Sequence, residues 1–147
     1  ASLEELRAHD FAPFKALRDA PMAMTAHVVY NAIDANNPAT TSPQAIADII
    51  RGEIGFDGLL MSDDLSMKAL SGDFATKTQA SFAAGCDVVL HCNGLMEEMR
   101  PVAQAATVLS GEGLARANRA LAGLGANDGV NEDAIREEFS TMFEAIV

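Results

Sequence analysis

Residues 55–67 read Gly-Phe-Asp-Gly-Leu-Leu-Met-Ser-Asp-Asp-Leu-Ser-Met, and this stretch decides the fold of the chain. The apolar run 59–61 follows a glycine-rich turn and stops at Ser62 and two adjacent carboxylates, which predicts a short buried strand. In α/β proteins the carboxyl ends of parallel strands carry the chemistry. The pattern therefore places Asp63 where a nucleophile or a metal ligand is expected.

The segments on both sides of this strand alternate between helix and strand patterns. Apolar runs at 22–29 and 87–90 predict two more strands, and helical spacing at 42–54 and 74–84 predicts the helices between them. A capping-box pattern starts a helix at Ser2, and the sequence beyond residue 94 is helical with breaks at 111–113 and 123–129 and a last helix at 132–145. This alternation predicts an α/β fold with parallel strands and right-handed crossovers.

The sequence of residues 55–67 resembles that of the family 3 glycoside hydrolases, in particular their bacterial β-N-acetylglucosaminidase branch. Ala-His-Val-Val-Tyr at 26–30 and Asn-Pro-Ala-Thr-Thr-Ser at 37–42 support the resemblance, which covers at least residues 2–93. The family folds as a TIM (β/α)8 barrel. The resemblance implies that residues 1–147 are the C-terminal portion of such a domain, with its last three strands and helices, and that the N-terminal part of the barrel is absent.

The resemblance also implies a reaction and a role for one residue. Family members of this branch remove terminal β-linked N-acetylglucosamine with retention of configuration, here from cell-wall muropeptides in the cytoplasm. Asp63 would be the nucleophile that forms the covalent glycosyl-enzyme ester, and no cofactor is implied. From the spacing alone, a turn-capping role for Asp63 is an equal alternative. Asp64 is expected to accept hydrogen bonds from loop amides or to support a cation.

Four further residues are candidates for contact with the sugar: His27, Tyr30, Met67 and His91. Two of them, His27 and His91, are expected near strand ends, and Met67 lies in the turn after Asp63. Each has a structural alternative, because a lone histidine or tyrosine at such a position is often a hydrogen-bonded or packed residue.

Two motifs of the family branch do not occur in this chain. The branch has its general acid/base, a histidine supported by an aspartate, on a mobile loop ahead of the region that corresponds to Ser2, and a Lys-His-Phe-Pro-Gly-His-Gly phrase earlier still. Without them we expect the chain alone to be inactive. Three strands cannot close a barrel, so we expect pairing with another copy or with the missing N-terminal part. The alternative is a non-catalytic fragment that acts as a binding or assembly piece.

Composition narrows the remaining function classes. The chain has 147 residues, 49% of them hydrophobic, and a net charge of −11, which argues against nucleic acid or an anionic membrane as partner. The first residues do not form a signal peptide, and Cys86 and Cys92 are expected to be reduced core thiols, so a cytoplasmic location is predicted. No metal-ligand spacing is present. A phosphoryl-accepting receiver module is disfavoured, because no lysine follows the strand at 87–90.

Overall fold

Three parallel strands form the centre of this protein. A computed structural model describes residues 1–125, 129 and 131–144. The strands are β1 (Met22–Met24), β2 (Leu59–Asp64) and β3 (Val88–Leu90), in the spatial order β1-β2-β3. Both neighbouring pairs are parallel. The predicted α/β class and the parallel strands are confirmed, and no other strand pairs with the outer edges of β1 and β3 among the described residues.

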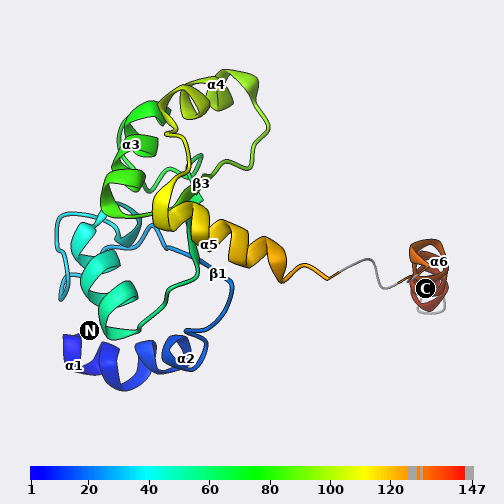
Figure 1. The fold of residues 1–147 in the computed structure, drawn as a ribbon, viewed down its shortest axis with the longest axis horizontal. Helices are drawn as coiled ribbons and strands as arrows, with labels where there is room; N and C mark the ends of the chain where they lie inside the picture. The colour runs from blue at the N-terminus through cyan, green and yellow to red at the C-terminus, as the bar shows by residue number, and fades with distance from the viewer. Residues whose placement is uncertain (126–128, 130, 145–147) are drawn as a thin grey trace.

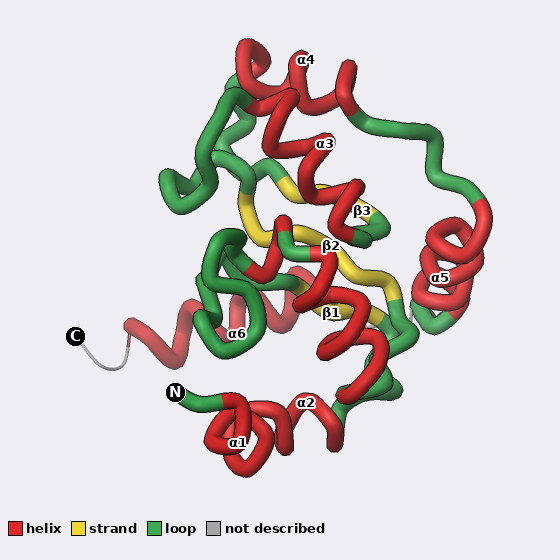
Figure 2. The backbone as a smooth tube through the Cα atoms, turned by 90° about the vertical axis from the view of Figure 1, so that its left-hand side faces the viewer, coloured by secondary structure: helices red, strands yellow, loops and turns green. Residues whose placement is uncertain are grey.

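The crossover helices η3 and α3 lie on the same side of this sheet, whereas α6 lies apart from it (Figures 1 and 2). The helices are α1 (Leu3–Glu5), η1 (Leu6–Asp10), α2 (Phe11–Ala16), η2 (Ala39–Thr41), η3 (Ala45–Glu53), α3 (Phe74–Ala84), α4 (Met96–Ala105), α5 (Gly111–Ala122) and α6 (Glu132–Glu144). The predicted end of the last helix at Ala145 and residues 126–128 of a predicted break lie outside the described residues. Within the described part, every helix is too short or too polar to cross a membrane.

Local sequence signals account for several helix ends. The capping box is present, since Ser2 accepts a hydrogen bond from the Glu5 amide and the Glu5 side chain accepts one from the Ser2 amide. Asp73 caps the start of α3 through the Thr76 amide. Gly85 ends that helix in the left-handed conformation, with φ at 114°.

A single apolar cluster joins the N-terminal helices, η3, β2 and the end of α3. Its buried members are Leu6, Phe11, Ile46, Ile54, Phe56, Leu60, Ala84 and Cys86. Leu60 is 1% exposed and lies near the start of the strand that carries Asp63. The cluster therefore fixes β2 against the helices before the strand reaches its polar end.

The first strand is shorter than the predicted run 22–29. The chain leaves the sheet after the Thr25 amide, which donates to the Met61 carbonyl of β2. Residues 26–28 pair with η2 instead: the Ala39 amide donates to the Val28 carbonyl and the Thr40 amide to the Ala26 carbonyl. The predicted strand is therefore confirmed at 22–24, which pair with β2, and it is wrong at 25–29, where the chain forms no strand.

The predicted helix break at 111–113 is wrong. The chain is non-helical at 106–110, and α5 begins at Gly111 and continues through Gly113. A Cβ at Gly113 would lie 3.0 Å from the Leu109 side chain and 3.2 Å from a carboxylate oxygen of Asp87. Glycine at this position therefore serves the close approach of α5 to Asp87 and not a turn.

The two cysteines differ from each other. Cys86 is buried, and burial raises the pKa of its thiol to about 12, as expected of a core thiol. Cys92 is exposed, so its assignment to the core is wrong. It follows the end of β3, where the chain has already left the sheet.

The loop between β1 and η3 is organised by one carboxylate, Asp34. It accepts hydrogen bonds from the amides of Asn36 and Asn37, from the Asn37 side chain at 2.9 Å and from the Ser42 hydroxyl at 2.7 Å. The Asn37 side chain, then the Asn36 amide and Ser42, lower the pKa of Asp34 to about 2.

This shift predicts an acid-sensitive loop. Folding lowers the pKa of Asp34 from about 3.8 to about 2, so its contribution to stability is complete above about pH 4 and is lost as the pH falls to about 2. We expect the Asp34 carboxyl carbon to titrate in NMR spectra with a midpoint near 2. A Ser42→Ala variant should raise that midpoint, and an unchanged midpoint would contradict the assignment of Ser42 as a donor.

Candidate functional site

The site is built at the carboxyl end of β2, where the strand carries a β-bulge. Between Met61 and Asp64, β2 advances three residues while β3 advances two, from Val88 to Leu90. An extra residue in one strand locally bends it and re-aims its side chains, and bulges are frequent beside active sites. Asp63 lies within this bulge and is partly exposed. One of its carboxylate oxygens accepts a hydrogen bond from the Asp64 amide at 2.8 Å.

Asp64 has a different role from Asp63. Its carboxylate accepts hydrogen bonds from the Ser66 amide at 3.0 Å, from the Ser66 hydroxyl and from the Cys92 amide at 3.1 Å. Burial acts to raise the pKa of Asp64, but these hydrogen bonds outweigh it and hold the pKa below its usual range. The expectation that Asp64 accepts from loop amides is confirmed, and the carboxylate ties the turn after β2 to the end of β3.

His27 reaches from the end of β1 to the end of β2. Its Nε2 lies 3.0 Å from the carbonyl oxygen of Asp64, and its Nδ1 lies 2.8 Å from the hydroxyl of Thr40. The Thr40 hydroxyl is in turn 2.8 Å from the hydroxyl of Thr25. The predicted place of His27 beside the strand ends is therefore confirmed, and its ring is joined to the residue that follows Asp63.

The turn after β2 is also held from the helix layer. Lys77, on α3, is 8% exposed and donates to the carbonyl of Leu65 at 3.0 Å and to that of Met67 at 3.4 Å. Its ammonium lies 5.1 Å from the centre of the Phe74 ring. The Leu65 amide donates to the carbonyl of Leu90. Strand β3 and helix α3 thus fix the turn from two sides.

The other predicted sugar contacts have different surroundings. Met67 lies in the turn after β2 and is 43% exposed. The His91 side chain is 6% exposed, is 2.8 Å from a Glu98 oxygen and meets the Phe74 ring edge-on. Tyr30 packs against the apolar cluster. The structure brings Asp63, His27 and Met67 to one turn, holds the His91 side chain beside Glu98 near the end of β3, and places Tyr30 on the apolar cluster.

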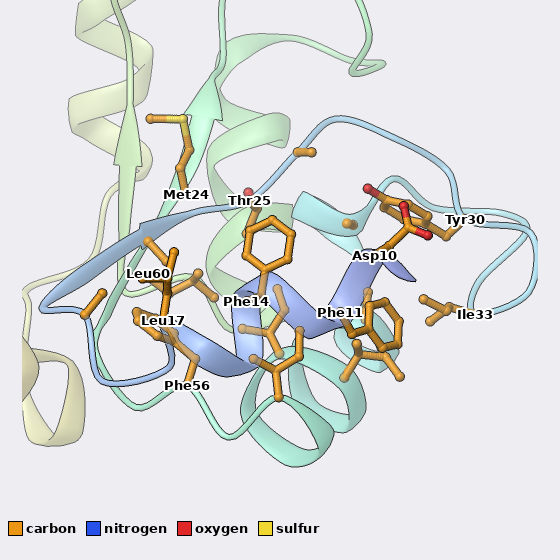
Figure 3. A pocket seen from close by; sticks show the side chains of 18 of the residues that line it. Asp10, Phe11, Phe14, Leu17, Met24, Thr25, Tyr30, Ile33, Phe56 and Leu60 are labelled. Carbon is orange, nitrogen blue, oxygen red and sulfur yellow. The ribbon is translucent and has the colours of Figure 1, made fainter. Parts of the chain in front are cut away.

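Tyr30 also lines an apolar cavity of about 420 Å³ beside β1 (Figure 3). The cavity lies between α2, β1 and η3, and its walls include Phe11, Phe14, Leu17, Met24, Tyr30 and Leu60. Phe14 and Leu17 are 60% and 65% exposed, and Met24 is 51% exposed. The edge of β1, which no strand among the described residues pairs with, thus adjoins a hydrophobic surface.

Sequence reasoning missed two groups of the site, Lys77 and the pair Thr25 and Thr40. Lys77 shares one helical face with Ser81 and Ala84, all buried, and a lysine on such a face was the available signal. No comparable signal existed for the threonines, because their contact with His27 depends on how the loop folds back on β1.

Comparison with known proteins shows the family of the chain. Residues 1–120 match the N-terminal domain of glycosyl hydrolase family 3. A β-hexosaminidase from Neisseria gonorrhoeae (strain ATCC 700825 / FA 1090) is 46% identical over 105 residues, which are 67% of this chain and 29% of the relative. The first relatives that match are thus covered over only about 27–29% of their length.

Solved structures of the family show the same fold. A glycoside hydrolase family 3 β-N-acetylglucosaminidase from Paenibacillus sp. str. FPU-7 superposes with a TM-score of 0.74 at 27% identity, covering 89% of this chain and 28% of that one. NagZ from Neisseria gonorrhoeae, in complex with N-trifluoroacetyl-D-glucosamine, superposes with a TM-score of 0.69 at 34% identity over 99% of this chain and 40% of that one. From the family match and these superpositions, the chain belongs to glycosyl hydrolase family 3 and is a homologue of its β-hexosaminidases.

Proposed function

We propose that Asp63 is the nucleophile of a retaining β-N-acetylglucosaminidase. The observation that carries the proposal is the position of Asp63, at a bulge on the carboxyl end of the central parallel strand, in a chain of this family. The neighbouring carboxylate, Asp64, is engaged by Ser66 and Cys92. Asp63 receives one amide hydrogen bond and is partly exposed, so it is the member of the pair that can meet a substrate.

The chemistry follows from that geometry. An ionised Asp63 attacks the anomeric carbon as the bond to the leaving oxygen breaks, and water later hydrolyses the ester with overall retention. The step needs a general acid within reach of the leaving oxygen. His27 has both ring nitrogens in hydrogen bonds within the protein, and the His91 side chain is 6% exposed. We therefore propose that neither acts as the acid, and that the chain alone does not complete hydrolysis.

The proposed substrate is a glycan that ends in N-acetylglucosamine. Terminal β-linked N-acetylglucosamine, as in muropeptides from the cell wall, is the expected glycan, and a related NagZ was solved with an N-trifluoroacetyl-glucosamine. The cytoplasm is the proposed location. The Met67 side chain, exposed in the turn beside Asp63, is the proposed sugar contact nearest in sequence to the nucleophile.

A partner surface is part of the proposal. The three described strands are proposed to be the last three of a (β/α)8 barrel. Residues 1–147 would then be the C-terminal portion of that domain. The edge of β1, unpaired within the part of the chain that the structure describes, adjoins the apolar cavity and would pair with the N-terminal part of the barrel or with another copy. The same exposed surface favours the second candidate function, a non-catalytic fragment that binds or assembles through this edge.

The experiment is covalent labelling combined with fragment complementation. We expect a 5-fluoro N-acetylglucosaminyl fluoride to add one sugar to the chain, because fluoride leaves without an acid. We expect no hydrolysis of an aryl β-N-acetylglucosaminide by the chain alone, and hydrolysis after mixing with the part of N. gonorrhoeae NagZ that precedes the matched region.

The outcomes separate the two candidates. Hydrolysis by the chain alone would contradict the proposal that the chain has no general acid for the leaving oxygen. A chain that binds the NagZ part but is never labelled, alone or in the mixture, would favour the assembly function over the enzymatic one.

A further inference from the structure

We propose that His27 is a positioning residue that holds the nucleophile through the backbone of Asp64 and that it works as the Nε2–H tautomer. The inference rests on the proposed role of Asp63. It assigns to His27 a contact with the protein and not with the sugar, and it links three elements that are distant in sequence.

The tautomer follows from the partners of the ring. The Nε2 of His27 lies 3.0 Å from the Asp64 carbonyl oxygen, which can only accept, so Nε2 carries the hydrogen. In the neutral ring Nδ1 is then an acceptor, and the Thr40 hydroxyl donates to it at 2.8 Å. The single hydroxyl hydrogen of Thr40 is then used in this bond, so the hydroxyl of Thr25 is the donor in its 2.8 Å contact with the Thr40 hydroxyl. The hydrogen bonds run in one direction, from Thr25 to the Asp64 carbonyl.

The series of hydrogen bonds is rigid at its buried end, at Thr25 and Thr40. Thr40 is 0% exposed and Thr25 is 5% exposed, and the Thr25 amide donates to the Met61 carbonyl of β2. Buried side chains with their hydrogen bonds satisfied have few alternative rotamers. The His27 ring is therefore anchored to β1 and η2 and presents Nε2 at a fixed place.

The outer end acts on Asp63 through a single residue. The Asp64 carbonyl accepts from His27, and the Asp64 amide donates to a carboxylate oxygen of Asp63 at 2.8 Å. Rotation of the backbone at Asp64 would break both contacts, and the bulge at 62–63 gives this part of β2 fewer ladder hydrogen bonds to resist it. His27 thus fixes the amide that orients the nucleophile.

Two amides that resemble different halves of the imidazole test this role. In His27→Gln the side-chain amide nitrogen reaches the position of Nε2 and keeps the donor to Asp64. In His27→Asn it reaches only the position of Nδ1. With the 5-fluoro glycosyl fluoride, the C1–F bond breaks, the Asp63 oxygen bonds to C1 and fluoride departs, so the labelling rate reports the nucleophile alone.

We expect His27→Gln to label within about threefold of the wild-type rate and His27→Asn to lose about 10- to 100-fold in the limiting rate constant, with half-saturation by the reagent unchanged. Equal rates for the two variants would overturn the proposal. A change confined to half-saturation would also overturn it, because that is the result of a lost sugar contact. If His27→Asn fails to fold, Thr40→Val removes only the hydroxyl that orients the ring, and it should also slow labelling without changing half-saturation.

A spectroscopic readout makes the result independent of labelling. In ¹⁵N NMR spectra of the wild-type chain we expect a protonated Nε2 and an unprotonated Nδ1 for His27, and the opposite tautomer would overturn the proposal. A wild-type chain that shows the expected tautomer but takes no label, alone or complemented, would contradict the function proposed for Asp63 and leave the hydrogen-bond chain intact.

Discussion

Asp63→Asn is expected to abolish the one-sugar mass gain that the wild-type chain shows with the 5-fluoro glycosyl fluoride. The amide has nearly the shape of the carboxylate and can still accept from the Asp64 amide, but it is a very poor nucleophile toward the anomeric carbon. Loss of a nucleophile costs about a thousandfold or more in rate. Intact-mass spectrometry over a time course measures this loss directly.

The matched control is Asp64→Asn, one residue away. The Asp64 carboxylate is occupied by hydrogen bonds from Ser66 and Cys92, so its replacement should slow labelling only as far as the turn loosens. Peptide mapping of the wild-type product should place the ester on Asp63. An ester on Asp64, or full labelling of Asp63→Asn, would contradict the assignment of the nucleophile.

The sequence predicted the elements whose signals are local. Helix α3 has an N-cap at Asp73 and a left-handed glycine at Gly85, and both signals lie within the helix or next to it. The parallel order of the strands followed from the alternation of apolar runs with helical spacing. These predictions hold because backbone propensity, capping and burial of one face all favour the same structure.

The features that the sequence did not predict depend on contacts between distant segments. The bulge in β2 is visible only in its register with β3, and the pairing of 26–28 with η2 depends on how the loop folds back. Gly113 has the pattern of a helix break, yet it is inside α5 because Asp87 lies against it. For the candidate site, Asp63 was predicted from one stretch, whereas the support from Thr40 and Lys77 was not, since those residues are 23 and 14 positions away.

Asp87→Asn is expected to cause the largest loss of stability among single substitutions that remove no carbon from the core. The Asp87 side chain is 7% exposed and accepts from Arg51 at 2.8 Å, from the Leu60 amide at 2.9 Å and from Arg116 at 3.2 Å. It joins η3, the start of β2 and α5. The neutral amide removes the carboxylate that pairs with the partly buried guanidinium of Arg51, and it leaves Arg116 with Asp57 alone, which costs about 3–5 kcal/mol in the free energy of unfolding. Thermal unfolding at fixed protein concentration should show a midpoint lower by roughly 10 °C or more.

The control for this prediction is Asp57→Asn, in the same ion-pair cluster. Asp57 also pairs with Arg116, at 2.7 Å, and with Arg119 at 3.0 Å, but its side chain is 67% exposed, so water replaces the lost interactions. Its loss should cost less than about 1 kcal/mol. Equal unfolding temperatures for the two variants would contradict the prediction. They would show that the number of ion pairs, and not their burial, determines how much this cluster contributes to the stability of the fold. If Asp87→Asn unfolds at a much lower temperature than Asp57→Asn, the buried carboxylate of Asp87 holds α5 to β2 and the exposed carboxylate of Asp57 contributes little.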